Sequence, residues 1–499
     1  MNDFGMNLTN GFASLLGAGP ILAIVGGVLL GIAVGVMPGL SPAMGVALLV
    51  PFTWEMEPGT ALMFLVAVYV AASYGGSITA ITINTPGTPS AVVTAMDGHP
   101  MFKSGRAGEA LGVSLVSSTM AGLIGSIILI LFSVPLAAIA VKFHPAEYVA
   151  LAILGLATVA SLGGRDWRKS LITVLLGLLL ATVGGDPISG STRLSFGIPN
   201  LADGVSLIPA LIGMFALGEI LLQLERQIRT PASHSPSSTR WPRIIEYWRL
   251  KWCMIRSSLI GCLIGIVPGA GATIASFISY DITRRLSGRS GEFGSGVPEG
   301  IASAESANSG SVGGALVPLL TLGLPGSATT AVLIGAMMIH KLVPGPALFT
   351  KKPDVVYGLF ASLLVANIVL LIVGMLGSRL WVQVARVPRA LLFPMIAMLA
   401  IIGSFAVRSS LFDVGSCAAF GLLGWLLRRH DYPTAPVILG LVLGSIAELN
   451  LRRAFMMDGW DVFIDRPIAG AMLLLAILAI LVPVLRNRSD ARGVSQDPT

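Results

Sequence analysis

Charged residues are scarce in this sequence of 499 residues. Asp, Glu, Lys and Arg together make up 11% of it, whereas apolar residues make up 54%. A soluble protein of this size needs far more charge to cover its surface, since roughly a quarter of the residues in ordinary globular proteins are charged. The scarcity excludes a soluble enzyme, a nucleic-acid-binding protein and a disordered chain. It predicts an all-α polytopic membrane protein, because helices satisfy their own backbone hydrogen bonds in lipid.

The sequence motifs of enzymes and of bound cofactors are also missing. The three cysteines lack the paired spacing of a disulfide framework or a metal site. The five histidines form no metal-binding pair, and no phosphate-binding loop is present. We therefore expect no enzymatic activity, no cofactor and no resident metal. The alternative, a membrane-embedded acyl or glycosyl transferase, would need an acidic or histidine pair facing a cavity.

Long stretches without any charged residue divide the chain. One helical crossing of a bilayer needs about 20 apolar residues. Four of the stretches are much longer than that: residues 4–54, 58–96, 110–141 and 306–340. Together with the shorter stretches they predict roughly eleven to thirteen membrane segments. The first 19 residues lack the basic start of a cleaved signal peptide, so we expect this segment to be retained.

Three of the long stretches contain a Pro-Gly pair: Pro38-Gly39, Pro86-Gly87 and Pro325-Gly326. Proline ends or kinks a helix, and glycine lets the chain turn. Non-helical backbone at membrane depth persists only where it is buried in protein or lines a wet cavity. The pairs therefore predict re-entrant hairpins or broken helices. A simple proline kink in a continuous helix is the alternative at each site.

The two halves of the chain repeat this pattern. Four residues of the first half recur in the second half at an offset of 230: Gly31, Gly35, Pro38 and Gly39 match Gly261, Gly265, Pro268 and Gly269. The pair Gly75-Gly76 recurs as Gly313-Gly314, one residue further from the following Pro-Gly break. Repeated halves with interrupted helices are typical of secondary transporters that bind their cargo near the middle of the bilayer, often as inverted repeats. Small residues at a four-residue spacing also favour close helix packing, which we prefer for Gly27, Gly31, Gly35 and Gly39.

A basic stretch separates the halves. We expect a first transmembrane half at 1–225, a linker at 226–256, and a second half with a short basic tail at 257–499. Seven Lys and Arg residues but only one acid after Arg226 occur in the linker, which predicts a cytoplasmic location. The same loop bias explains the net charge of +7 without a nucleic-acid partner.

The segments around the second and third breaks contain hydroxyl and amide groups but no charge. Helices that restart after Pro86-Gly87 and Pro325-Gly326 would direct their N-terminal N–H groups at the break, which suits an anion such as a carboxylate without a fixed Lys or Arg. Helix caps and interhelical hydrogen bonds are the alternative roles. The candidate substrate-binding residues are Asn84, Thr85, Gly87, Thr88, Ser90, Gly326, Ser327 and Thr329. The candidate break or hinge residues are Pro38, Gly39, Ser41, Pro86, Pro268, Gly269 and Pro325.

A second set of polar residues could bind a coupling ion. Oxygen atoms at the broken helix ends are the ligands that a sodium ion needs, and a carboxylate within the membrane is a functional candidate by default. The candidates are Asn84, Glu305, Asn308 and Thr321. We expect Na⁺ or H⁺ as the coupling ion and no metal beyond a transported sodium ion. For Glu305 the alternative is a carboxylate at the start of a helix near the membrane surface.

Several of these motifs together resemble the large membrane subunit of the tripartite tricarboxylate transporters, the TctA type. The resemblance spans nearly the whole chain. It rests on Pro38-Gly39-Leu40, Tyr74-Gly75-Gly76-Ser77-Ile78, Asn84-Thr85-Pro86-Gly87-Thr88-Pro89, Asp97-Gly98-His99-Pro100-Met101, Pro298-Glu299-Gly300, Glu305 with Asn308, and Gly313-Gly314 through Leu324-Pro325-Gly326-Ser327. Ser309 replaces the second asparagine of the family pattern Ala-Pro-Glu-Ala-Ala-Asn-Asn.

The resemblance implies a symporter of the bacterial inner membrane that imports small carboxylates such as citrate and is driven by a sodium or proton gradient. It implies three kinds of contact beyond the cargo: a small membrane subunit of about four helices, a periplasmic solute-binding protein and the lipid bilayer. It also implies an elevator-like motion of the hairpin region. The alternative is a stand-alone ion-coupled carboxylate carrier or channel of similar architecture.

Overall fold

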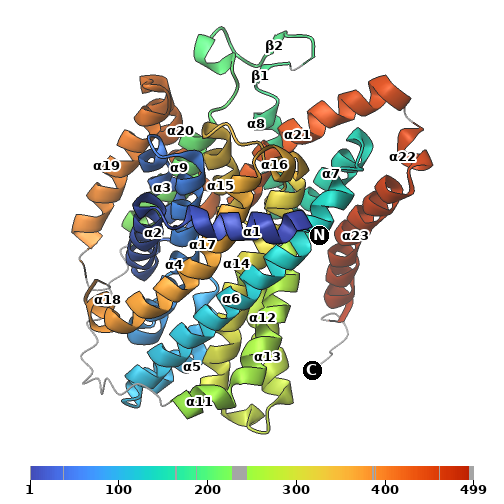
Figure 1. Cartoon of the computed structure of the whole chain (residues 1–499). Coiled ribbons are helices and arrows are strands. Elements are labelled where there is room, and N and C mark those ends of the chain that lie inside the picture. Colours follow the sequence, from blue (N-terminus) through green and yellow to red (C-terminus); the bar gives the residue numbers. More distant parts are fainter. Residues whose placement is uncertain are drawn as a thin grey trace.

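The chain folds into a bundle of helices (Figure 1). The computed structural model describes residues 2–37, 39–162, 166–186, 188–226, 244–384, 387, 389–459 and 461–493. Pro38 and most of the predicted linker lie outside these residues. Within them, the one sheet is a two-stranded antiparallel hairpin. The expected all-α architecture is thereby confirmed.

The first part of the chain contains two interrupted helices followed by one very long helix. The helices are α1 (Asn2–Ser14), α2 (Ala18–Val36), α3 (Pro42–Leu49), α4 (Pro58–Ile83), α5 (Ala91–Lys103) and α6 (Ala107–Ala140), with a 3₁₀ turn at Val50–Thr53. Between α2 and α3 the chain turns at Gly39, whose φ of 89° suits glycine. After α4 it turns at Asn84, which has a φ of 53°.

The same order of helices recurs in the second half. The helices are α12 (Lys251–Ile266), α13 (Gly271–Leu286), α14 (Pro298–Leu322), α15 (Ala328–Ile339), α16 (Pro346–Lys351) and α17 (Pro353–Leu376), with a 3₁₀ turn at Ser290–Glu292. Gly269 (φ 82°) turns the chain between α12 and α13, and Gly323 (φ 72°) ends α14. In Figure 1, α2 and α3 lie above α12 and α13, so the two hairpins approach the middle of the molecule from opposite ends.

The remaining helices flank this centre. The first group is α7 (Pro145–Leu162), α8 (Trp167–Ala181), α9 (Leu207–Ile212), α10 (Gly218–Arg226) and α11 (Ile244–Arg249), with a 3₁₀ turn at Pro199–Leu201 and a π-helical turn at Gly213–Leu217. Strands β1 (Gly184–Gly185) and β2 (Thr192–Arg193) lie between α8 and α9. The second group is α18 (Ser378–Val384), α19 (Arg389–Arg408), α20 (Leu411–Arg429), α21 (Ala435–Asp458), α22 (Val462–Asp465) and α23 (Pro467–Gly493).

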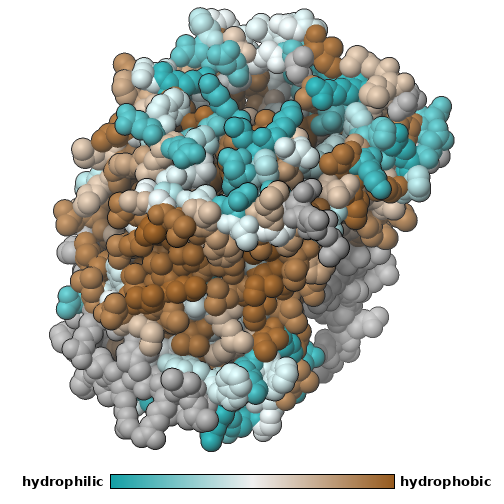
Figure 2. All heavy atoms as spheres, in the orientation of Figure 1, coloured by the Kyte–Doolittle hydropathy of each residue, from teal (hydrophilic) through white to brown (hydrophobic). Residues whose placement is uncertain are grey.

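Eight helices among the described residues are long and apolar enough to cross a membrane. They lie at Ala18–Val36, Pro58–Ile83, Ala107–Ala140, Leu207–Glu225, Pro353–Leu376, Ala390–Arg408, Leu411–Arg429 and Ala435–Met457. Four shorter apolar helices, Pro42–Thr53, Pro145–Ser161, Ala328–Ile339 and Pro467–Leu481, accompany them. A broad apolar band crosses the middle of the surface, with polar residues at both ends (Figure 2). The number of complete crossings stays a prediction.

Glycines bring the interrupted helices close together. A Cβ at Gly31 of α2 would lie 2.7 Å from the Val68 carbonyl oxygen of α4, and a Cβ at Gly261 of α12 would lie 2.3 Å from the Ala307 carbonyl oxygen of α14. Such spacing is tighter than any side chain allows, so these glycines are there for helix packing, as expected. Gly39 differs, because it lies against the side chain of Gln223.

The glycine contacts recur in the two halves at fixed offsets. Gly75 lies against the carbonyl oxygen of Ile32, and Gly314 lies against that of Cys262. The first helices of the two pairs, α2 and α12, are thus related by an offset of 230 residues. The second helices, α4 and α14, are related by an offset of 239 residues. Gly314 therefore matches Gly75, and Ala315 matches Gly76. The sequence pattern pairs Gly75-Gly76 with Gly313-Gly314 and needs one extra residue of spacing. This pairing is wrong by one position, because Gly313 packs against Gly125 of α6 instead.

Candidate functional site

A cavity of about 780 Å³ lies where the interrupted helices meet. The starts of five helices line it: α3 at Ser41–Pro42, α5 at Ser90, α13 at Gly269–Gly271, α15 at Ser327–Ala328 and α21 at Thr434–Ala435. The first N–H groups of a helix have no partner within it, and each N-terminus carries about half a positive charge. Five such ends around one cavity make it attractive to an anion.

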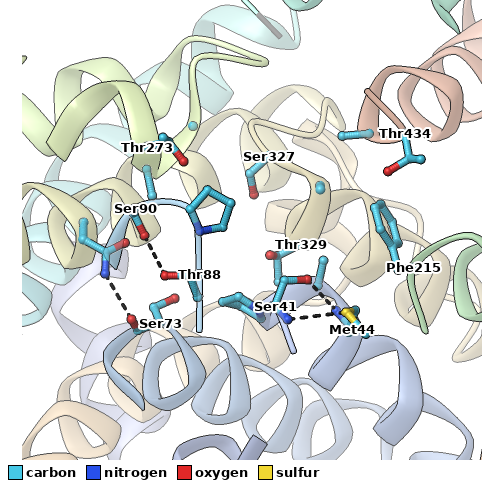
Figure 3. A pocket seen from close by; sticks show the side chains of 18 of the residues that line it. Ser41, Met44, Ser73, Thr88, Ser90, Phe215, Thr273, Ser327, Thr329 and Thr434 are labelled. Atoms are coloured by element: carbon cyan, nitrogen blue, oxygen red, sulfur yellow. Dashed lines mark hydrogen bonds between the residues drawn. The ribbon is translucent and has the colours of Figure 1, made fainter. Parts of the chain in front are cut away.

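Hydroxyl groups surround the same space, which we call the hairpin cavity (Figure 3). The Ser41 hydroxyl accepts the Met44 N–H and caps α3, and the Ser327 hydroxyl accepts the Thr330 N–H and caps α15. Between α4 and α5, the hydroxyls of Thr88 and Ser90 lie 3.0 Å apart. Some of these hydroxyls therefore cap helices, which is the alternative role expected from the sequence. The same residues also line the cavity.

Many of the predicted residues meet at this cavity. Its lining includes the candidate substrate residues Gly87, Thr88, Ser90, Ser327 and Thr329. It also includes the break residues Gly39, Ser41, Pro86 and Gly269 and the ion candidate Asn308. The side-chain amide of Asn308 donates to the Ser73 carbonyl oxygen at 3.0 Å, which joins α14 to α4 behind the cavity wall.

Besides Glu305, six other candidates among the described residues lie away from the lining. Asn84 forms the exposed outer turn after α4, and Thr85 follows it. The chain re-enters only at Gly87, whose N–H donates to the Gly76 carbonyl oxygen. The hydroxyl of Thr321 donates to Val317 within its own helix. Gly326, Pro268 and Pro325 belong to the second-half breaks but are not part of the cavity surface.

Sequence reasoning overlooked several residues of the lining. Tyr69 and Ser73 are spaced by one helical turn on α4, and Ser77 continues their row; this polar stripe was a usable signal. The lining also includes Phe215 and Thr434, which are distant in the sequence from the break motifs. An ion pair between Glu219 and Arg428 is likewise part of the lining and far from these motifs in the sequence. The expectation of a cavity without any Lys or Arg is therefore wrong, although Glu219 balances the charge of Arg428.

A fully buried carboxylate lies on α14, between the two halves. Glu305 Oε1 accepts hydrogen bonds from the hydroxyls of Ser77 on α4, at 2.6 Å, and Thr94 on α5. Its Oε2 accepts one from Ser118 on α6, at 3.0 Å. No Lys or Arg forms an ion pair with it within the described part of the chain. We call these four residues the carboxylate cage.

Further oxygen atoms are available on the helices of the cage. The hydroxyls of Ser114, Ser117 and Thr119 on α6 and of Ser306 on α14 are buried without a hydrogen-bond partner. Hydroxyls can rotate to donate or to accept, so the cage suits either a charged or a protonated carboxylate. Glu305 does not lie at the start of a helix, because α14 begins seven residues earlier at Pro298.

A second buried carboxylate joins the two halves at one end of the molecule. Asp97 on α5 accepts the N–H groups of Gly294, Gly296 and Val297, each at 2.9 Å. The Tyr280 hydroxyl donates to its other oxygen at 2.7 Å. Asp97 thus holds the connection between α13 and α14. The described residues contain no group of three or more His, Cys, Asp or Glu side chains that could hold a metal ion.

Comparison with known proteins places these features in one family. Residues 21–439 match the family model of the tripartite tricarboxylate transporter TctA family. The chain is 37% identical over 502 residues to an uncharacterized 52.8 kDa protein in the TAR-I ttuC' 3' region of Agrobacterium vitis, with both chains fully covered. An uncharacterized protein in the TAR-II ttuC' 3' region of Agrobacterium vitis is also 37% identical, over 242 residues that cover 48% of this chain and all of the relative. No solved structure matches. The chain belongs to the tripartite tricarboxylate transporter TctA family and is a membrane transport protein.

Proposed function

We propose that this chain is the large translocation subunit of a cation-driven importer of small carboxylates such as citrate. The five helix N-termini that line the hairpin cavity carry this proposal. They attract negative charge, and the hydroxyls of Thr88, Ser90, Ser327 and Thr329 can donate to carboxylate oxygens. The volume of about 780 Å³ is in the range of small-molecule sites.

The carboxylate cage supports coupling to a cation. A carboxylate buried within the membrane region without a basic partner is costly unless it binds a cation or a proton. Glu305, Ser77, Thr94 and Ser118 supply oxygen ligands of the kind that Na⁺ requires, and the same carboxylate can take up H⁺. Asn308 lies one turn further along α14 and lines the hairpin cavity. An ion bound at Glu305 would therefore change the electrostatic potential at the cargo site.

Family membership supports a role beside other subunits. We infer that a small membrane subunit of about four helices and a periplasmic solute-binding protein act with this chain in a bacterial inner membrane. The interrupted hairpins would move as a unit, in an elevator-like motion, against the flanking helices. The division into halves at 1–225 and 257–499 fits the recurring helix order, although α12 already begins at Lys251.

Reconstitution of the purified subunits in liposomes tests the proposal. With the cognate binding protein, the small subunit and an inward Na⁺ or H⁺ gradient, labelled citrate or another carboxylate should accumulate inside. Liposomes without a gradient are the control for coupling. Liposomes that lack the binding protein distinguish the stand-alone carrier or channel, which would transport without it. Flux that is independent of any gradient would overturn the proposal.

A further inference from the structure

One ion pair lies in the wall of the hairpin cavity. Arg428, near the end of α20, donates from Nη1 to Glu219 Oε2 on α10 at 2.6 Å. Both residues line the cavity, and about a fifth of each side chain is exposed, 18% for Arg428 and 21% for Glu219. Neither residue belongs to a hairpin or to a break motif. Arg428 is the one basic residue of the described chain in the cavity lining.

The pair is connected to two of the helix starts that line the cavity. Arg428 donates from Nε and Nη2 to the hydroxyl of Thr434, which precedes α21, at 3.3 and 3.2 Å. Glu219 Oε1 accepts the side-chain amide of Gln223 at 2.9 Å. That amide lies against Gly39, at the turn of the α2–α3 hairpin. The remaining oxygen of Gln223 is buried without a partner.

A purely structural role explains this placement poorly. A buried ion pair stabilises a fold little, because the desolvation of both charges offsets their attraction. Helices α10 and α20 already pack closely through Gly218 and Gly424, which do not line the cavity. The guanidinium of Arg428 instead lines the cavity while it is paired with the carboxylate of Glu219. A planar guanidinium binds carboxylates with two parallel hydrogen bonds, so a cargo carboxylate can replace that of Glu219.

We propose that Arg428 is a specificity-determining residue that selects cargo with two or more carboxylates. This inference rests on the proposed function. One carboxylate of the cargo would lie at the helix N-termini near Thr88 and Ser327, and a second would replace Glu219 on Arg428. A monocarboxylate gains only the first set of contacts. Glu219 acts as an internal competitor that keeps weak or single-ended ligands from Arg428.

Ligand binding to the purified chain in nanodiscs tests this assignment, with citrate, succinate and propionate as probes in calorimetry. We expect Arg428→Gln to weaken the binding of citrate and of succinate at least about tenfold, which is the effect of one lost charged hydrogen-bonding pair. The affinity for propionate should stay unchanged. Arg428→Lys, which keeps the charge but loses the fork, should lie between. Glu219→Gln should strengthen citrate binding, because the arginine no longer has an anionic partner.

The matched control is Arg408→Gln. Arg408 forms an ion pair with Asp413 at 2.8 Å but does not line the hairpin cavity. This variant should lower thermal stability without changing the ratio of citrate to propionate affinity. Equal weakening of all three probes by Arg428→Gln, or unchanged citrate binding in both Arg428→Gln and Glu219→Gln, would overturn the assignment. Failure of the wild-type chain to bind any carboxylate would instead count against the proposed function.

Discussion

Two single glycines hold the re-entrant hairpins in place. A Cβ at Gly87 would lie 2.6 Å from the Gly35 carbonyl oxygen, and one at Gly326 would lie 2.8 Å from the Ala315 Cα. Both neighbours are backbone atoms and cannot move aside alone. We expect Gly87→Ala and Gly326→Ala each to lower stability by about 1–3 kcal/mol and to reduce uptake strongly, while membrane insertion continues.

Thermal unfolding and uptake by vesicles measure these effects. Gly26 of α2 provides the control, because nothing lies within 4 Å of the Cβ it would gain. Gly26→Ala should leave both measurements unchanged. Normal uptake by Gly326→Ala or by a bulkier Gly326→Leu would contradict the role of this hairpin in forming the site.

The charge of Glu305 is predicted to be essential for coupling. Glu305→Gln keeps the shape of the side chain in its cage but can neither bind a proton nor neutralise a cation. We expect gradient-driven accumulation to fall by at least about tenfold, while carboxylate binding at the hairpin cavity persists. Asp281→Asn, at an exposed carboxylate of α13, is the control and should transport normally. Full accumulation by Glu305→Gln would exclude the cage as the coupling site.

The sequence predicted the site residues that belong to motifs but missed those that depend on distant packing. Thr88, Ser90 and Ser327 follow Pro-Gly breaks, so their place at restarting helices was predictable. Asn84 belongs to the same motif, yet it forms the outer turn. Glu219 and Arg428 are 209 residues apart, and no local pattern indicates that α10 and α20 pack side by side.

Helix ends supply the positive potential of the cavity, and the cap of α15 tests their contribution. Ser327→Ala removes the hydroxyl that accepts the Thr330 N–H, which costs about 1 kcal/mol for a typical cap. We expect lower thermal stability together with a raised KM for carboxylate uptake. Ser410→Ala removes an equivalent cap from α20, where the hydroxyl accepts the Phe412 N–H. Because Ser410 does not line the cavity, this control should lose stability alone. An equal KM in both variants would argue against the N-terminus of α15 as a ligand.

A charge network ties the β1–β2 connection to α21. Asp186 binds Arg452 at 2.8 Å, and Glu448 binds Arg193 at 2.7 Å. The backbone N–H groups of Ser189 and Ile188 and the two arginines lower the pKa of Asp186 from 3.8 to about 2. The ionised form is therefore the one that folding favours. Its contribution is complete above the unfolded pKa of 3.8 and is lost as the pH falls through 2.

Hydrogen exchange of the β1–β2 connection measures this contribution. The protection factor of the Ile188 and Ser189 amides should be constant from about pH 5 to 8 and should decrease below about pH 4. Asp186→Asn should be less protected at neutral pH and should lose this acid step. Asp203→Asn, between β2 and α9, is the control. An acid step of equal size in Asp186→Asn would assign it to another group.

Basic residues are numerous at one end of the molecule, which we call the basic end. Helices α5 and α11 and the α13–α14 connection lie at the end opposite β1 and β2 (Figure 1). Basic residues lie in and directly beside these segments: Lys103, Arg106, Arg249, Lys251, Arg284, Arg285 and Arg289. The connection from 182 to 206 contains only Arg193, with Asp186 and Asp203. The positive-inside bias predicts that the basic end faces the cytoplasm.

Cysteine labelling from outside intact cells tests this orientation. Ser189 and Ser290 are exposed serines at the two ends. An impermeant maleimide should label Ser189→Cys and should label Ser290→Cys only after the membrane is opened. The wild-type chain gives the background, since Cys262 and Cys417 are buried and Cys253 is partly buried. The reverse pattern would invert the topology.

The fold class was predictable from the whole chain, whereas the helix count was not. Scarce charge and long apolar stretches are enough to indicate a helical membrane protein. They cannot separate a crossing from the arm of a hairpin, because α3 and α15 are as apolar as full spans but only 8 and 12 residues long. Conversely, α14 is buried along most of its length yet contains many Ser and Gly residues, so hydropathy alone does not identify it as a span.

The converging helix starts have a physiological consequence. Peptide groups have no ionisable proton, so the attraction for anions that the helix starts exert does not change with the acidity of the surroundings. A variation of the transport rate with pH would therefore originate outside the helix starts, for example in the ionisation of the cargo or in the proton that the carboxylate cage would carry. At acid and at neutral pH the helix starts would thus offer the cargo the same electrostatic attraction.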